Sequence, residues 1–149
     1  MPHSFVTTAA AILAAGLTLA SVVGTASATA PDPVGLWATP SSGGIVEIER
    51  CGDAMCGALV TSPYLKFDPN LRDRKNPDAS KRERLLKGLA LMSGFQGGGG
   101  KWTDGTLYNP DNGVVYTASL EVLSVDRIRV RGCAPAHFCK VQIWTRAAD

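Results

Sequence analysis

Short runs of alternating apolar and polar residues, each ended by Gly, Pro, Asn or Asp, repeat along this sequence from residue 34 onward. In the clearest run one set of side chains shares a face: Val114, Tyr116, Ala118, Leu120 and Val122. The residues between them, Thr117, Ser119 and Glu121, are polar. Alternation with a period of two is typical of a β-strand with one buried face. A fold built from such segments must be rich in β-structure.

Eight segments carry this strand character: residues 34–39, 44–51, 55–62, 89–96, 101–108, 114–123, 127–133 and 138–146. Most are separated by turns of hairpin length, such as Asn109-Pro110-Asp111-Asn112-Gly113, which favour antiparallel neighbours. Closing such a meander removes the exposed edges that an open sheet presents. We therefore expect an all-β fold, an eight-stranded antiparallel up-and-down barrel. Its interior would be filled by side chains or hold one small ligand.

One connection departs from this pattern. Residues 64–87 are polar, contain Pro69 and Pro77, and carry eight Lys and Arg against four Asp and Glu, a formal charge of +4. Asp78 is expected to cap a short helix that runs to about Leu86, with Gly88 as its stop. Connections this long are typical of lids or functional loops.

The first thirty residues contain no Asp, Glu, Lys or Arg. The apolar stretch from Ala9 to Val23 is shorter than the roughly 20 residues that span a bilayer. Small residues then fit cleavage after Ala28 or Ala30. We expect residues 1–30 to be a signal peptide, 31–149 to be one domain, and the protein to be exported to the periplasm or the cell exterior. No transmembrane segment is expected, and a net charge of +2 does not indicate nucleic acid as a partner.

Four cysteines lie in the expected domain, at positions 51, 56, 133 and 139. An even number in an exported chain indicates disulfides, whereas zinc sites need closer spacing and reduced thiols. Each pair flanks a hairpin turn, where directly opposed residues approach to disulfide distance. The sequence therefore predicts the bridges Cys51–Cys56 and Cys133–Cys139, each contributing about 2 kcal/mol.

Residues that could perform catalysis are few. His137 is the one histidine of the expected domain, so a Cys–His pair or a multi-histidine zinc site is not available. Glu47 and Glu49 share a strand face that we interpret as solvated. Gly97 to Lys101 lacks the spacing and the following Ser or Thr of a phosphate-binding loop. We expect no metal and no cofactor, and a binding protein rather than an enzyme.

Aromatic residues are the candidate ligand contacts. They are spread over several strands and the charged connection, and an apolar cavity with a few polar groups is typical of a small-molecule site. The candidates are Tyr64, Phe95, Trp102 and Tyr116.

Two sets of motifs resemble known families. Gly35-Leu36-Trp37 near the start and Trp144-Thr145-Arg146 near the end resemble the lipocalin pattern, which implies that Trp37 closes the barrel floor and Arg146 stacks over it. The runs IERCGDAMCGALV, LLKGLALMSGF, KWTDGTLYNPDNGVVY and RGCAPAHFCKVQIWTR resemble the bacterial domain-of-unknown-function family 2147. This resemblance implies an exported, lipocalin-like protein that binds a small molecule and has no assigned catalytic residues.

Two functions are consistent with these features. The first is binding of a small apolar or amphipathic molecule in the barrel, with residues 64–87 near its open mouth. The alternative is a protein-interaction module of the cell envelope that uses the basic segment 66–87.

Overall fold

The computed structural model describes residues 1, 31–135 and 138–148. Residues 2–30 of the expected signal peptide and His137 lie outside the described residues.

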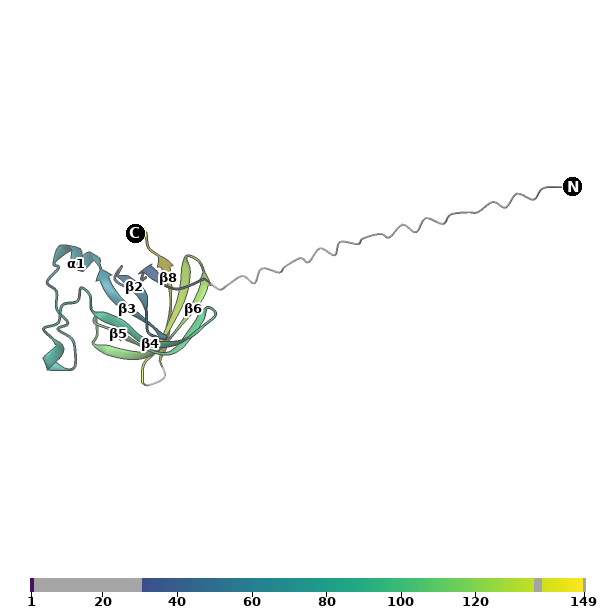
Figure 1. Ribbon diagram of the computed structural model, residues 1–149. Helices are drawn as coiled ribbons and strands as arrows, with labels where there is room; N and C mark the ends of the chain where they lie inside the picture. Colours follow the sequence, from purple (N-terminus) through teal and green to yellow (C-terminus); the bar gives the residue numbers. More distant parts are fainter. Residues whose placement is uncertain (2–30, 136–137, 149) are drawn as a thin grey trace.

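Eight antiparallel strands form one closed barrel in which each strand pairs with the next and the last pairs with the first, which confirms the predicted fold (Figure 1). The strands are β1 (Gly35–Ala38), β2 (Ile45–Cys51), β3 (Ala54–Thr61), β4 (Ala90–Gly98), β5 (Lys101–Asn109), β6 (Val114–Ser124), β7 (Arg127–Cys133) and β8 (Cys139–Arg146). Inward and outward side chains alternate as the sequence pattern predicts. On β2, Val46 and Ile48 are buried, whereas Glu47 and Glu49 are exposed.

One end of the barrel is closed by Trp37, which is completely buried. Its Nε1 donates to the carbonyl of Pro33 at 2.7 Å, and Arg146 Cζ lies 4.3 Å from the ring centroid. The Arg146 guanidinium also donates to the carbonyls of Val34 and Val125. This cation–π contact between Arg146 and Trp37 is the one that the lipocalin resemblance implies, and it joins β8 to β1.

Large side chains fill the interior next to this closed end. Trp37, Ile48, Met55, Met92, Phe95, Trp102, Leu120 and Ile128 are all buried in one cluster. The Phe95 ring packs directly on the backbone of β5, so a Cβ at Gly105 would lie 2.3 Å from that ring. Glycine at position 105 is therefore required by the close approach of an aromatic ring to the strand.

Both predicted disulfides are present, one at each end of the barrel. Cys133 and Cys139 are directly opposed, as expected. Cys51 and Cys56 are not, because a two-residue turn pairs Cys51 with Ala54 and Cys56 with Glu49. The first bridge therefore runs diagonally across its hairpin, with Cα atoms 6.0 Å apart, which corrects the expected register.

The charged connection between β3 and β4 stands beside the barrel in Figure 1 and differs from its prediction. It begins with a helix that the sequence reading missed, α1 (Pro63–Phe67), which is capped by the Ser62 hydroxyl and has Pro63 in its first turn. Asp78 caps the helical turn η1 (Ala79–Lys81) as expected, but that turn does not continue to Leu86. Residues 84–86 instead pair with residues 71–73, and this small ladder takes the backbone groups that a longer helix would need.

Candidate functional site

A cavity of about 590 Å³ opens at the end of the barrel opposite Trp37. It is bordered by the four connections of that end: β1–β2, β3–β4, β5–β6 and β7–β8. We call this end the mouth. Most of the cavity wall is apolar and consists of Val46, Leu59, Leu71, Leu86, Leu91, Leu107, Tyr116, Val130, Phe138 and Trp144.

Small residues leave this half of the barrel hollow. Gly44 and Gly132 both line the cavity. A Cβ at Gly132 would lie 3.3 Å from Tyr116 and 3.9 Å from Leu107, so position 132 faces inward without a side chain to fill the space. The closed half, by contrast, is filled by the large side chains of Trp37, Phe95 and Trp102. The distribution of side-chain volume therefore sets where the barrel is open.

Polar groups in the wall are paired with each other. Trp144 Nε1 donates to Gln142 Oε1 at 2.9 Å, and Gln142 Nε2 donates to Ser41 Oγ at 2.7 Å. Asn112 Nδ2 donates to Tyr116 Oη at 2.8 Å. The side-chain donors of Trp144, Gln142 and Asn112 are therefore already paired, so the entry of an apolar ligand would not leave these three donors unsatisfied.

The charged connection supplies part of the wall through Leu71 and Leu86, whose backbones pair with each other. Its position depends on Asp73, which is 1% exposed. Asp73 Oδ1 accepts from Tyr108 Oη at 2.5 Å, and Oδ2 accepts from Asn76 Nδ2 at 2.8 Å and from Arg84 at 2.7 Å. Since Tyr108 belongs to β5, this carboxylate joins the connection to the barrel.

A second link joins the connection to the rim. Lys75 Nζ donates to the Asp111 carbonyl at 2.6 Å, and Ser42 Oγ donates to the Asp111 carboxylate at 3.0 Å. Gly113 lies so close to Lys75 that a Cβ would be 2.0 Å from the Lys75 carbonyl oxygen, and its φ is +72°. The β1–β2 turn, the charged connection and the β5–β6 turn thus support one another at the mouth.

The Asp73–Tyr108 pair gives this link a defined pH range. Burial by itself would raise the Asp73 pKa, but the hydrogen bonds from Arg84, Tyr108 and Asn76 outweigh burial and lower the pKa below 3.8. Burial, followed by the hydrogen bond to Asp73, raises the Tyr108 pKa to about 12. The ionised Asp73 carboxylate therefore stabilises the fold fully at pH values above its ordinary pKa, and this stabilisation is lost as the pH falls and the carboxylate is protonated. The neutral Tyr108 phenol stabilises the fold fully at pH values below its ordinary pKa of 10.0, and this stabilisation is lost as the pH rises toward 12 and the phenol ionises.

We expect an alkaline titration of Tyr108 to show this coupling. Ultraviolet absorbance of the wild-type protein minus that of Tyr108→Phe should give a phenol titration with a midpoint near 12, since burial and then the hydrogen bond to Asp73 both favour the neutral phenol. In Asp73→Asn the midpoint should move down toward 10.0. A wild-type difference curve centred at the ordinary value would contradict the coupling.

The four candidate ligand contacts divide into two groups. Tyr64 and Tyr116 line the cavity. Phe95 and Trp102 do not, because they are 0% and 4% exposed within the core cluster next to the closed end. Leu71 and Leu86 were missed, although they are among the few aliphatic residues in a strongly charged segment, which is the signal that could have found them.

The arginines of the charged connection are engaged within it. Arg72 and Arg74 pair with Glu83, and Arg84 pairs with Asp73. Arg82 donates to the Asn76 carbonyl. These side chains stabilise the connection itself, so the structure does not favour them as the contact surface of the alternative interaction module.

Within residues 1, 31–135 and 138–148, no group of three or more His, Cys, Asp or Glu side chains is placed to hold a metal ion. Over the same described residues, no helix is long and apolar enough to cross a membrane.

Comparisons with known proteins agree with this architecture. A solved structure, protein HP1028 from the human pathogen Helicobacter pylori, is described as belonging to the lipocalin family. It superposes with a TM-score of 0.71 at 18% sequence identity, covering 80% of this chain and 85% of that chain, which establishes a shared lipocalin-like fold. No curated protein matches the chain. Residues 35–146 match the family model described as an uncharacterized protein conserved in bacteria, DUF2147. The chain therefore belongs to the bacterial DUF2147 family.

Proposed function

We propose that this protein is exported to the periplasm or the cell exterior and binds a small apolar or amphipathic molecule in the mouth of its barrel. The observation that carries this proposal is the cavity of about 590 Å³ with a mostly apolar wall. Its volume lies within the roughly 300–1,000 Å³ of small-molecule sites in proteins.

The distribution of apolar and polar residues along the wall supports an amphipathic ligand. The deep part of the wall is formed by Val46, Val130 and Trp144, which are 0%, 1% and 2% exposed. Its outer part includes Asp111, Asn112 and Lys140, all exposed. An apolar tail would therefore lose water in the barrel while a polar group stays at the rim. Two disulfides and an apolar, uncharged N-terminal segment support export.

A cavity-filling variant tests this proposal. In Leu107→Trp the larger indole would fill part of the cavity. We expect the affinity for the neutral fluorescent probe N-phenyl-1-naphthylamine to fall at least about tenfold. The matched control is Thr106→Trp, on the same strand but with an exposed, outward side chain. It should bind the probe like the wild type.

Fluorescence titration measures the affinities, and thermal unfolding checks that both variants are folded. Native mass spectrometry of protein purified from its own cell envelope should show an added small-molecule mass. The proposal is wrong if the wild type binds no probe, or if both variants, although folded, lose binding equally.

A further inference from the structure

The exposed aromatic side chains of the described chain gather at the mouth. Phe67, Phe138 and Tyr64 are 92%, 78% and 65% exposed, whereas no other aromatic residue is among the exposed large hydrophobic side chains of the described part. Tyr64 and Phe67 lie one turn apart on α1, and Phe138 belongs to the β7–β8 connection. Tyr64 and Phe138 both line the cavity, so aromatic rings stand on two separate connections of its rim.

The formal charge is also concentrated at this end. The described residues of the connections that border the mouth (39–44, 62–89, 109–113, 134–135 and 138), together with Lys140, carry nine Lys and Arg against five Asp and Glu, a charge of +4. The rest of the chain carries six against eight, a charge of −2. The protein therefore has an electric dipole, and a negatively charged surface would orient it so that the mouth faces that surface.

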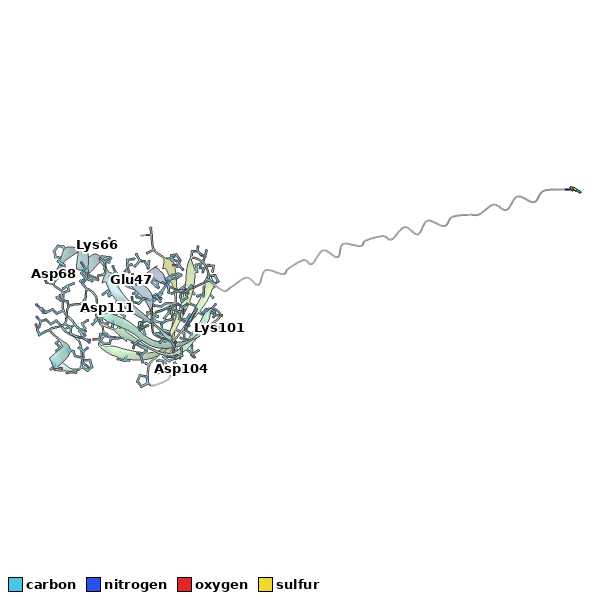
Figure 2. All side chains as sticks on the ribbon, in the orientation of Figure 1. Glu47, Lys66, Asp68, Lys101, Asp104 and Asp111 are labelled. Carbon is cyan, nitrogen blue, oxygen red and sulfur yellow. A yellow bond between two sulfur atoms is a disulfide. The ribbon has the colours of Figure 1, made fainter. Side chains whose placement is uncertain are left out.

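Three lysines at the mouth are available to such a surface. Lys66, Lys87 and Lys140 form no ion pair with any described residue, in contrast to the arginines of the charged connection. In Figure 2, Lys66 lies beside Asp68 at the α1 end, away from Lys101. Lys101, by comparison, pairs with Glu121 on the outside of the barrel.

The opposite end has a different surface. Its exposed apolar residues are aliphatic: Val34 is 41% exposed and Val125 67% exposed. Among the described residues there, Arg50 pairs with Asp32, Lys101 with Glu121, and Arg146 is occupied by Trp37 and three backbone carbonyls. Arg127 is the one cation of that end with no ion pair to a described residue, and no exposed aromatic ring lies beside it in the described chain.

We propose that the mouth docks on the surface of an anionic phospholipid bilayer. Exposed aromatic rings partition into the interfacial region of a bilayer, and lysines next to them attract anionic headgroups. Docking in this orientation places the cavity opening against the lipid, so an amphipathic ligand could pass between bilayer and barrel without crossing water. The inference builds on the proposed function by naming the surface with which the site exchanges its ligand.

The native tryptophans allow a direct test. Trp37 and Trp102 are 0% and 4% exposed and do not line the cavity, so bilayer lipids cannot reach them in the folded protein. Trp144 lies in the cavity wall, so quenching of the wild type by the same vesicles is subtracted from that of each variant. In Phe67→Trp, the added indole should be quenched by vesicles that contain phosphatidylglycerol with brominated acyl chains. In Val125→Trp, an indole at an exposed position of the closed end should not be quenched. Quenching of both indoles, or of neither, would overturn the proposed orientation.

The electrostatic part has its own test. Co-sedimentation with phosphatidylglycerol vesicles should weaken about fivefold for each of Lys66→Gln and Lys87→Gln, and it should weaken as salt is raised. Phosphatidylcholine vesicles should retain much less protein. Equal binding to both lipids would refute the charge-guided docking.

Failure of docking is distinguishable from failure of ligand binding. Phe67, Lys66 and Lys87 do not line the cavity, so Phe67→Ser, Lys66→Gln and Lys87→Gln should bind N-phenyl-1-naphthylamine like the wild type in the absence of vesicles. Normal probe binding without any vesicle binding would disprove the docking and leave the proposed function standing. Probe binding by Leu107→Trp tests the cavity and gives no information on docking, because Leu107 lines the cavity.

Discussion

Replacing Trp37 by alanine should lower the free energy of unfolding by about 3–5 kcal/mol, one of the two largest effects that we expect in this protein. The side chain is completely buried and closes one end of the barrel. Its removal leaves a cavity in the core cluster, leaves the Pro33 carbonyl without its donor, and takes the ring away from the Arg146 guanidinium 4.3 Å from it. Each of these losses adds to the cost of the missing apolar contacts.

Urea unfolding measures this effect as a shift in the midpoint with little change in slope. Trp37→Phe should lose about 1–2 kcal/mol, since a ring remains beneath Arg146 but the hydrogen bond to Pro33 is gone. The surface control Val125→Ala, at a position that is 67% exposed, should change stability by less than about 0.5 kcal/mol. If Trp37→Ala were as stable as this control, Trp37 would not be what closes the barrel.

Replacing Asp73 by alanine should release the charged connection from the barrel while the strands stay paired. Three donors lose their acceptor: the Tyr108 hydroxyl, the Asn76 amide and the Arg84 guanidinium. Arg84 is 42% exposed and can be hydrated again, so most of the cost falls on the other two. A loss of about 3 kcal/mol in local stability would raise the population of the released connection more than 100-fold.

Trypsin provides the measurement because the connection contains eight Lys and Arg. When opening is fast relative to cleavage, the cleavage rate follows the open population, so Asp73→Ala should be cut about 100-fold faster between residues 66 and 87. Asp78→Ala is the matched control within the same segment. Its carboxylate is 45% exposed, pairs with Lys81 at 3.2 Å and caps only η1, so cleavage should rise less than about tenfold. Equal acceleration in both variants would show that Asp73 has no special role.

Asp73→Ala should also bind the probe more weakly, because release of the charged connection removes the Leu71 and Leu86 side chains from the cavity wall. A variant cut as fast as expected but with unchanged probe affinity would mean that the strands alone form the ligand site.

Local patterns were sufficient to predict the barrel. The alternation on β2 and β6, the turn at residues 109–113 and the two cysteine pairs each depend on residues close together in the chain. Helix α1 had a local N-cap signal as well, Ser62 followed by Pro63. Its five residues are too few to show the periodic apolar pattern that predicts a helix. The helix predicted after Asp78 does not extend to Leu86 because residues 84–86 pair with residues 71–73, which lie 11 to 15 positions earlier in the chain.

The candidate ligand contacts could not be separated from the sequence. Phe95 and Tyr116 both lie on inward-facing strand positions, and only the height of each residue along the barrel axis distinguishes core from cavity wall. That height follows from strand tilt and register around the whole barrel, including the register shifts in β3–β4 and β5–β6 pairing. Likewise, the sequence showed a segment with charge +4, but only the folded chain pairs its arginines internally and leaves Lys66 and Lys87 without an ion pair to any described residue.

By itself, then, the sequence of this protein determined an eight-stranded barrel with two hairpin disulfides and a family membership, since strand alternation, turn residues and short cysteine spacings act over a few positions. Only the tertiary structure decided which end is hollow, that Asp73 joins the charged connection to β5, and that the aromatic rings and positive charge gather at the mouth. These features arise when barrel closure brings together side chains from connections that are far apart in the chain, and a local sequence pattern does not determine such contacts.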